Sequence, residues 1–354
     1  MEIKLNIDGK DIVVPKGTML LDACRMAGAD IPTFCYDPDL RLAGSCRMCV
    51  VEAKGFRTLL ASCVTPAQDG MVIQTESPDV VEARKVVLEL MLARHKLTCH
   101  TCEKDGECKL QDYCYRYGVT ESRFAGFRHE FYKDDPNPFI ERDYDKCIMC
   151  TRCVRACDEI TGARAINVAE RGHHAHIATA FDGNLEDSPC AFCGQCIMVC
   201  PVGALSSKIA AGLGKPAQNE KVLTTCTFCG TGCTLELNVN KGKVVGVTSV
   251  RDEKWSPVNK GALCVKGRFG WDFIHSPERL TTPLIKENGE FRPASWDEAL
   301  DLAAEKILKI KEEYGPDALA MFSSARMTNE ENYLAQKLMR AAIGSNNVDH
   351  CARL

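Results

Sequence analysis

The sequence predicts a multidomain α+β protein in which several small modules follow one another along the chain. Three observations support this fold class. Residues 1–78 combine alternating apolar and polar positions with a short helical stretch, five cysteine-rich runs lie between Cys35 and Cys264, and helices alternate with short apolar runs after residue 275. A chain of 354 residues typically forms two or three domains, at roughly 150 residues per domain, so these modules must be small.

The composition favours reduced cysteines that bind metal. The chain has 22 cysteines and a net charge of -4, which gives no nucleic-acid signature. Its start, MEIKLNIDGKDIVV, lacks the basic and apolar segments of a secretion signal, and no stretch reaches the ~18 apolar residues of a membrane span. Disulfides need an oxidising compartment. We therefore expect a cytoplasmic protein without nucleic-acid partners or a membrane span, whose cysteines are not disulfide-bonded.

Residues 1–78 are predicted to form the first domain, a small α+β module. Apolar residues alternate in Ile3–Ile7 and Ile12–Val14 around Asp8-Gly9-Lys10, which is typical of a hairpin. Helical spacing over Met19–Ala27 ends at Gly28, a plausible helix-terminating glycine.

Four cysteines in this module have the spacing C-x₁₀-C-x₂-C-x₁₃-C. The spacing differs from that of plant ferredoxins, but its place after a compact hairpin and helix favours a [2Fe-2S] centre. A zinc site is the alternative. Gly44 would let backbone amides approach the sulfurs. The predicted ligands are Cys35, Cys46, Cys49 and Cys63.

An amphipathic helix over Pro78–His95 leads into the second group, which lies within residues 79–119. The group has the pattern His95-x₃-Cys99-x₂-Cys102-x₅-Cys108. His95 lies one turn before the C-x₂-C pair, so its imidazole can face the same site. A neutral imidazole ligand should shift the potential of a [4Fe-4S] cluster, as histidine does in Rieske centres. His100 would point away, and Cys114 is expected to be structural.

Residues 138–210 follow a polar connector (120–140) and contain two C-x₂-C-x₂-C-x₃-C runs, the spacing of bacterial ferredoxins. In that spacing three thiolates of a run hold one cubane and the fourth reaches the other. Zinc ribbons use pairs of C-x₂-C instead of this doubled run. One cluster would take Cys147, Cys150, Cys153 and Cys200, and the other Cys190, Cys193, Cys196 and Cys157.

The fifth group lies within residues 219–275 and has the spacing C-x₂-C-x₃-C-x₃₀-C. It would hold one more [4Fe-4S] cluster through Cys226, Cys229, Cys233 and Cys264. Lys266 follows two residues later and would place a cation against this cluster or a neighbouring cofactor. A solvated surface lysine is the alternative.

Residues 276–354 indicate the start of a doubly wound α/β domain. Ser295-Trp-Asp-Glu298 and Thr328-Asn-Glu-Glu331 have the capping-box pattern that begins a helix. The first helix is predicted over Ala299–Glu313 and the second to end near Gly344, with strands at Ala318–Phe322 and from Asn347 onward.

Several residues of metal-binding type remain outside these groups. Cys24 is expected to be a core residue, and Cys351 is unassigned. The run His173-His174-x-His176 has no partner nearby in the sequence and is expected in an exposed strand or loop.

The order of these motifs resembles that of three families. Residues 1–210 resemble the N-terminal region shared by the large iron–sulfur subunit of respiratory complex I, the [FeFe]-hydrogenases, and NAD(P)-linked or electron-bifurcating formate dehydrogenases. The resemblance implies that the first module is a β-grasp [2Fe-2S] ferredoxin domain. Cys226–Lys266 followed by Gly270–Leu284 resembles the opening domain of the molybdopterin oxidoreductases.

The last stretch of the chain resembles formate dehydrogenase catalytic (alpha) subunits. The resemblance rests on Ser323–Tyr333 and Asn346–Arg353. In that family a Cys-Ala-Arg-x stretch is followed at once by the active-site cysteine or selenocysteine, and here Leu354 occupies the x position. It implies that no catalytic residue lies within the chain and that one follows immediately after Leu354.

The family resemblance implies the N-terminal, iron–sulfur part of a formate dehydrogenase that interconverts formate and CO₂. Its cofactors would be one [2Fe-2S] cluster, four [4Fe-4S] clusters and, in the full-length protein, a molybdenum or tungsten bis-molybdopterin guanine dinucleotide. Its electron partner would be a flavin- and NAD(P)-binding iron–sulfur subunit, a ferredoxin or a hydrogenase subunit. This chain alone is expected to be inactive on formate.

Two alternatives remain open at the level of sequence. One is a non-catalytic iron–sulfur subunit of a complex I-like NADH dehydrogenase or of a hydrogenase complex. The other is a zinc-stabilised scaffold, which iron content would separate from both.

Overall fold

The computed structural model describes residues 1–124, 130–133 and 136–351. The chain divides into two units, Met1–Glu220 and Lys221–Leu354, and each is described by itself. Among the described helices, none combines the length and apolar character that a membrane crossing requires.

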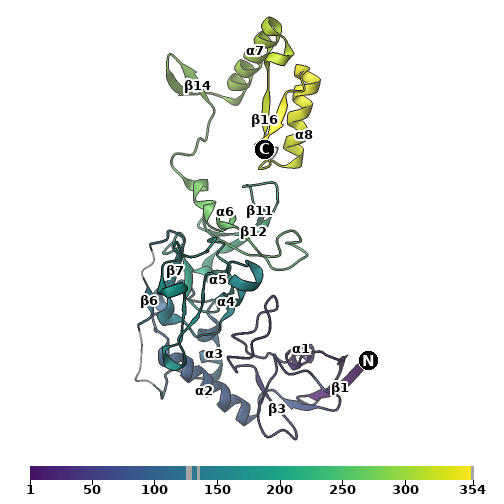
Figure 1. The fold of residues 1–354 in the computed structure, drawn as a ribbon, viewed down its shortest axis with the longest axis vertical. Coiled ribbons are helices and arrows are strands. Elements are labelled where there is room, and N and C mark those ends of the chain that lie inside the picture. Colours follow the sequence, from purple (N-terminus) through teal and green to yellow (C-terminus); the bar gives the residue numbers. More distant parts are fainter. Residues whose placement is uncertain (125–129, 134–135, 352–354) are drawn as a thin grey trace. The chain divides into compact units, whose positions relative to one another are not determined.

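The first unit begins with a five-stranded sheet in the order β2-β1-β5-β3-β4. Figure 1 shows β1 and β3 of this sheet near α1. β1 and β2 pair antiparallel, and the turn between them places Asp8 and Gly9 at φ 51° and 82°, the left-handed geometry of tight hairpin turns. The predicted hairpin is thus confirmed. The strands are β1 (Glu2–Ile7), β2 (Lys10–Pro15), β3 (Val50–Ala53), β4 (Leu60–Ala61) and β5 (Val72–Gln74).

Helix α1 (Leu20–Met26) completes the core of this sheet. Its residues Leu20, Leu21 and Cys24 are fully buried with the inward-facing strand residues, so Cys24 is a core residue as predicted. Gly28 follows the helix at φ 89°, the left-handed conformation that favours glycine at this position.

Two helices carry the chain past the first module. α2 (Pro78–Arg94) begins at Ser77, whose side chain accepts a hydrogen bond from the Val80 amide, and it ends at His95, as the sequence predicts. α2 packs against β3 and against α3 (Lys109–Tyr117). A short 3₁₀ turn, η1 (Cys99–Thr101), lies between α2 and α3.

The rest of the first unit holds short elements around the paired cysteine runs. A three-stranded sheet has the order β10-β7-β6. α4 continues into a wider turn, η3, closed by a hydrogen bond from the Thr161 amide to the Ala156 carbonyl. The elements are β6 (Tyr132–Lys133), β7 (Ile140–Asp143), α4 (Arg152–Arg155), η3 (Ala156–Ile160), β8 (Asn167–Ala169), β9 (His176–Ala178), α5 (Gln195–Val199) and β10 (Leu205–Ser207), with 3₁₀ turns η2 (Tyr144–Lys146), η4 (Gly172–His174), η5 (Ala180–Asp182) and η6 (Pro216–Gln218).

The predicted connector at 120–140 is only partly irregular, because β6 and the start of β7 lie within it. Its residues 125–129 and 134–135 are outside the described part of the chain.

The second unit opens with a three-stranded sheet in the order β11-β12-β13, followed by two short helices. Its elements are β11 (Glu220–Thr225), β12 (Thr234–Asn240), β13 (Lys243–Thr248), α6 (Val265–Phe269) and η7 (Gly270–His275). The helices pack on β13.

The remainder of the second unit has the predicted α/β pattern, with α7 and α8 drawn on either side of β16 (Figure 1). β16 and β17 pair in parallel, with Met321 opposite Val348. The elements are α7 (Trp296–Tyr314), η8 (Pro316–Ala318), β16 (Met321–Ser323), α8 (Asn329–Lys337), η9 (Leu338–Ile343) and β17 (Val348–His350). Gly344 ends the second helix at φ 90°, as predicted.

Three details differ from the prediction. The strand at Ala318–Phe322 begins only at Met321, because Pro316 starts a 3₁₀ turn. The Ser295 side chain caps α7, but the Glu298 carboxylate pairs with Arg292, so only half of that capping box forms. At Thr328 both halves are present. The hairpin of β14 (Leu284–Glu287) and β15 (Glu290–Pro293) was not predicted.

Candidate metal centres

All 22 cysteines lie in the described residues, and all are thiols. Over that same part of the chain, no group of three or more His, Cys, Asp and Glu side chains is arranged to hold a single metal ion. Within each of the five predicted ligand groups, the sulfurs are instead related in one of three ways. They share hydrogen bonds, line the same cavity, or affect one another's pKa.

The first group gathers four thiols from the loops around β3 and β4. The Cys35 amide donates to the Cys46 sulfur over 3.4 Å. Cys35 also shares hydrogen bonds between side chains with Cys46 and Cys63, and Cys49 shares one with Cys63. The four sulfurs therefore form one connected set.

Hydrogen bonds within this set divide the thiols into donors and acceptors. Hydrogen bonds from Cys46 and Cys63 hold the pKa of Cys35 well below its usual range. A hydrogen bond from Cys63 lowers the pKa of Cys49 to about 6. The same contacts raise the pKa of Cys46 and Cys63. The set thus stabilises thiolates, the form of cysteine that ligates metal.

Gly44 has a steric role beside this set. Its φ is 61°, and a β-carbon there would lie 3.0 Å from both methyl groups of Val64. Glycine therefore fits both the left-handed backbone and the close contact with the residue after Cys63.

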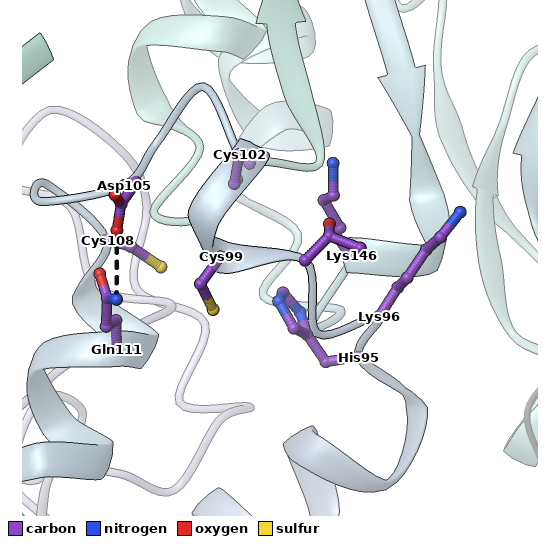
Figure 2. A pocket seen from close by; sticks show the side chains of 10 residues that line it. His95, Lys96, Cys99, Cys102, Asp105, Cys108, Gln111 and Lys146 are labelled. Carbon is purple, nitrogen blue, oxygen red and sulfur yellow. Dashed lines mark hydrogen bonds between the residues drawn. The ribbon is translucent and has the colours of Figure 1, made fainter. Parts of the chain in front are cut away.

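The second group surrounds a pocket between the end of α2 and the start of α3. His95, Cys99, Cys102 and Cys108 all line it. In Figure 2 the sulfurs of Cys99 and Cys108 and the ring of His95 point toward the same space. His95 is 7% exposed, whereas His100 is exposed to solvent. The structure therefore brings His95, and not His100, to the three thiols.

Two further residues of this pocket come from the ferredoxin-type module. Lys146 and Gly203 line the pocket. Lys146 directly precedes Cys147, and Gly203 comes three residues after Cys200. A β-carbon at Gly203 would be 2.3 Å from the Cys102 sulfur. The second group therefore shares a wall with the segments that carry Cys147 and Cys200.

The third and fourth groups follow the crossed arrangement that the spacing predicts. One cavity is lined by Cys147, Cys150, Cys153 and Cys200, which come from the two different runs. Among the remaining four thiols, burial raises the pKa of Cys196 most strongly, followed by the charges of Cys193, Cys190 and Cys157 and then by that of Cys200 from the first cavity.

The two runs also have the same backbone conformation. In each run the residue two positions after the first cysteine donates its amide to that cysteine's sulfur, Met149 to Cys147 at 3.3 Å and Phe192 to Cys190 at 3.4 Å. Both donors are left-handed, at φ 54° and 49°. Amides that point at sulfur stabilise the thiolate and tune a bound cluster.

Burial sets the protonation of the thiols in the shared cavity. It raises the pKa of Cys147 to about 11 and that of Cys150 to about 12. These thiols are neutral at pH 7 in the absence of metal, so binding iron here releases protons.

The fifth group lies in the second unit, on the loop before β12 and at the start of α6. The Cys226 amide donates to the Cys233 carbonyl at 2.8 Å. Burial raises the pKa of Cys233, and the charges of Cys226, Cys229 and Cys264 raise it further. The four thiols therefore belong to one electrostatic site.

Lys266 acts on the same site. Its ammonium lowers the pKa of Cys226 and Cys229, although burial dominates at Cys226 and hydrogen bonds from Thr231 dominate at Cys229. Its side chain is also exposed. Lys266 is thus an exposed cation whose charge acts on Cys226 and Cys229, and its contact with a bound cluster or cofactor stays a prediction.

The loop of the fifth group packs on the segment that follows β16. The Gly230 amide donates to the Ala325 carbonyl at 2.7 Å, and a β-carbon at Gly230 would lie 2.8 Å from that oxygen. Ser324 in turn contacts the Cys351 sulfur at 3.6 Å, beyond the end of β17. The thiol loop is therefore next to the carboxyl ends of two parallel strands, where α/β folds bind ligands.

The remaining residues of metal-binding type have other partners. Burial raises the pKa of Cys114 to about 11, and this thiol lines a second pocket beside the second group. The ring of His176 contacts the His174 carbonyl and the Asp182 carboxylate. The residue expected after Leu354 is outside the described residues, as are Ala352, Arg353 and Leu354 themselves.

Sequence reasoning missed the charged residues that support these groups. Arg84, on the inner face of α2, is completely buried and donates to the carbonyl of Val50, the residue after Cys49. A charged residue at an apolar position of the amphipathic pattern was the available signal, because such a residue must be paired when buried.

Five family models match consecutive stretches of the chain. They are the 2Fe-2S iron-sulfur cluster binding domain (1–78), the NADH-ubiquinone oxidoreductase-G iron-sulfur binding region (84–123), the ferredoxin-like domain of NADH-quinone oxidoreductase subunit 3 (137–206), the molybdopterin oxidoreductase Fe4S4 domain (219–276) and molybdopterin oxidoreductase (279–354). The chain belongs to the iron–sulfur molybdopterin oxidoreductases. Its thiol-rich groups fit [2Fe-2S] and [4Fe-4S] clusters in donor type and in N–H···S contacts.

Curated relatives of this chain have several names. The alpha subunit of an NADPH-Fe(3+) oxidoreductase of Geobacter sulfurreducens is 41% identical over 99% of this chain, and a subunit of an NADH-quinone oxidoreductase of Rhizobium meliloti is also 41% identical over 99%. A Staphylococcus aureus protein provisionally named a formate dehydrogenase is 34% identical over 99%. The chain spans about 40% of the length of these relatives.

A solved structure resembles part of this chain. A chain of an NAD+-reducing [NiFe]-hydrogenase in the H2-reduced state is 34% identical, with a TM-score of 0.56. The match covers 60% of this chain and 91% of that chain. The family thus includes subunits of multisubunit electron-transfer complexes, and this chain is an iron–sulfur electron-transfer protein of that family.

Proposed function

We propose that this chain conducts electrons between a formate-converting molybdenum or tungsten centre of the whole protein and an NAD(P)- or ferredoxin-linked partner. One observation carries the proposal. The loop of the fifth group contacts Ala325 at the carboxyl ends of β16 and β17, where a doubly wound fold binds its ligand. A pterin-held metal in that position would supply two-electron oxidation of formate to CO₂ and a proton, and bound clusters would supply one-electron transfer.

The chain's own residues prepare this route. In the second unit Gly230 lets the thiol loop approach Ala325, and Lys266 places positive charge beside Cys226 and Cys229. In the first unit the crossed thiol groups share a protein wall with the second group through Lys146 and Gly203. Burial keeps water away from the four thiols of the shared cavity, which favours transfer over side reactions with solvent; they are Cys147, Cys150, Cys153 and Cys200.

A second candidate is a subunit without substrate chemistry of its own, in a complex I-like NADH dehydrogenase or a hydrogenase complex. Two observations favour it. The 41% identical relatives are named for reactions of NADPH and NADH, and the solved hydrogenase chain matches 60% of this chain. In that case the electrons would arrive from a nicotinamide-oxidising partner.

Reduction by substrate separates the two candidates. The complete protein, purified without oxygen, is mixed separately with formate, NADPH and NADH, and the visible absorbance of its clusters is followed, with dithionite as the positive control. Bleaching by formate supports the formate proposal. Bleaching by dithionite but not by formate contradicts it, and bleaching by NADPH or NADH after addition of the purified partner subunit then supports the second candidate.

A further inference from the structure

The loop that carries Cys35 is held by an arginine of the ferredoxin-type module. The guanidinium of Arg155 donates through one nitrogen to the Cys35 carbonyl and through another to the Arg41 carbonyl, both at 2.5 Å. One planar side chain therefore fixes both ends of residues 35–41. A guanidinium is suited to this because its donors have a rigid geometry.

Two more charged residues of the same helical segment bind the same loop. Arg152 pairs with Asp37, whose side chain is completely buried. The carboxylate of Glu159 accepts a hydrogen bond from the Arg41 amide at 2.7 Å. Arg152, Arg155 and Glu159, which we call the α4 clamp, are spaced so that they face one side of α4 and η3.

The same segment carries ligands of the crossed thiol groups. Cys153 follows Arg152 directly, and Cys157 follows Arg155 by two positions. Cys153 lines the cavity of the third group, and Cys157 contributes to the electrostatic environment of Cys196 in the fourth. The segment thus contacts the first group through the clamp and supplies thiols to the next two groups.

Stability alone does not account for such a clamp. A buried ion pair loses hydration, and its replacement by apolar residues is often neutral or stabilising. The clearest benefit of a buried ion pair is a fixed geometry, because displacement of one partner would leave the other charge buried and unpaired. The Asp37 side chain is fully buried, so the loop has one favourable position relative to Arg152.

We propose that the α4 clamp is a positioning device that holds the Cys35 loop in one place against the ferredoxin-type module, and that the guanidinium of Arg155 raises the reduction potential of the first group. Reduction adds one negative charge to a cluster, so a nearby cation stabilises the reduced form. This inference rests on the role of the chain as an electron conductor, but it does not depend on which substrate supplies the electrons.

The test compares Arg155→Gln with a matched control. Arg164→Gln removes another arginine of the same module, whose side chain is 79% exposed and bonds only locally to Asp158. Backbone hydrogen exchange of residues 35–41 should be at least about tenfold faster in Arg155→Gln, because the variant loses the charge-assisted hydrogen bonds to both the Cys35 and the Arg41 carbonyls. It should be unchanged in Arg164→Gln.

The second measurement is a dithionite titration followed by electron paramagnetic resonance. The midpoint potential of the first group should become more negative in Arg155→Gln, and it should move less in Arg155→Lys, which keeps the charge but loses the fork. The second and fifth groups, whose ligands lie on other segments, should keep their potentials. The electrons in this titration come from dithionite and not from formate or a nicotinamide. Its outcome is therefore independent of whether formate, NADPH or NADH reduces the protein.

Wild-type exchange rates and a wild-type potential in Arg155→Gln would overturn the proposal. If that variant does not load iron, Glu159→Ala takes its place, because it removes one hydrogen bond to the Arg41 amide and leaves both arginines in position. Exchange at Arg41 should then rise, and an unchanged rate there would overturn the proposal equally.

Discussion

Gly203 lies so close to Cys102 that a β-carbon on residue 203 would be 2.3 Å from the cysteine sulfur. The two residues belong to different thiol groups in sequence, since Gly203 follows the second ferredoxin-type run and Cys102 belongs to the His95 group. The contact therefore places the second group against the cysteine-rich pair, and only glycine leaves room for it.

Gly203→Ala is expected to displace Cys102 and to damage the second group selectively. The added methyl group cannot be accommodated at 2.3 Å without movement of the sulfur or the backbone. Iron analysis should show the loss of about four iron atoms per chain, the content of one cubane. Gly162→Ala is the control, because its β-carbon would meet nothing within 4 Å, and its φ of 71° adds a left-handed backbone cost that Gly203→Ala does not have. Equal iron contents in the two variants would count against the proposed site.

His95 and His100 provide a second comparison within one segment. His95 is buried in the pocket with the three thiols, whereas His100 is exposed. His95→Ala should abolish or alter the paramagnetic signal of one cubane and leave the others intact, and His100→Ala should leave all signals unchanged. Identical spectra for His95→Ala and the wild type would show that His95 is only a helix-terminating residue.

Metal content tests the set of groups as a whole. One two-iron and four four-iron clusters require about 18 iron atoms per chain and a matching amount of acid-labile sulfide. Protein purified without oxygen should approach this value. Stoichiometric zinc with little iron would instead support the zinc-stabilised scaffold that the looser spacing of the first group leaves open.

Local patterns predicted the elements and the grouping of thiols well. The hairpin at Asp8 and Gly9, the helix from Pro78 and the capping box at Thr328 follow from interactions within a few residues, and all are present. The crossed arrangement was also predictable, because the spacing of the two runs limits which thiols can face one cavity. The turn at Asn288-Gly289 carried a strong hairpin signal of the same local kind, but the prediction overlooked it.

Contacts between distant segments could not be predicted in this way. Nothing near Cys35 indicates that Arg155, 120 positions away, binds its carbonyl, and nothing near Cys102 points to Gly203. Such contacts depend on how modules pack, which is set by surfaces rather than by periodicity.

Arg84 is another such contact, and its cost can be measured. Its guanidinium donates to the Glu76 carboxylate at 2.7 Å and to the Tyr117 hydroxyl and the Val50 carbonyl at 2.8 Å each. The Arg84 side chain is fully buried, so its own bonds cannot be replaced by bonds to water, whereas the 44% exposed Glu76 carboxylate keeps Arg116 and Tyr117 as partners. Arg84→Met keeps much of the volume but leaves polar partners unsatisfied, and we expect it to lower the free energy of unfolding by about 3 kcal/mol.

Arg116→Met is the matched control, because Arg116 binds the same Glu76 carboxylate and also Asp30 from a 31% exposed position. Solvent screens that pair, so its loss should cost less than about 1 kcal/mol. For a unit of this size the two costs correspond to a fall in the thermal midpoint of about 8 °C for Arg84→Met and under about 3 °C for Arg116→Met. Circular dichroism of the iron-loaded protein measures both shifts. Equal shifts would mean that burial of Arg84 adds nothing to a surface pair, and that α2 is held to β3 by its apolar residues alone.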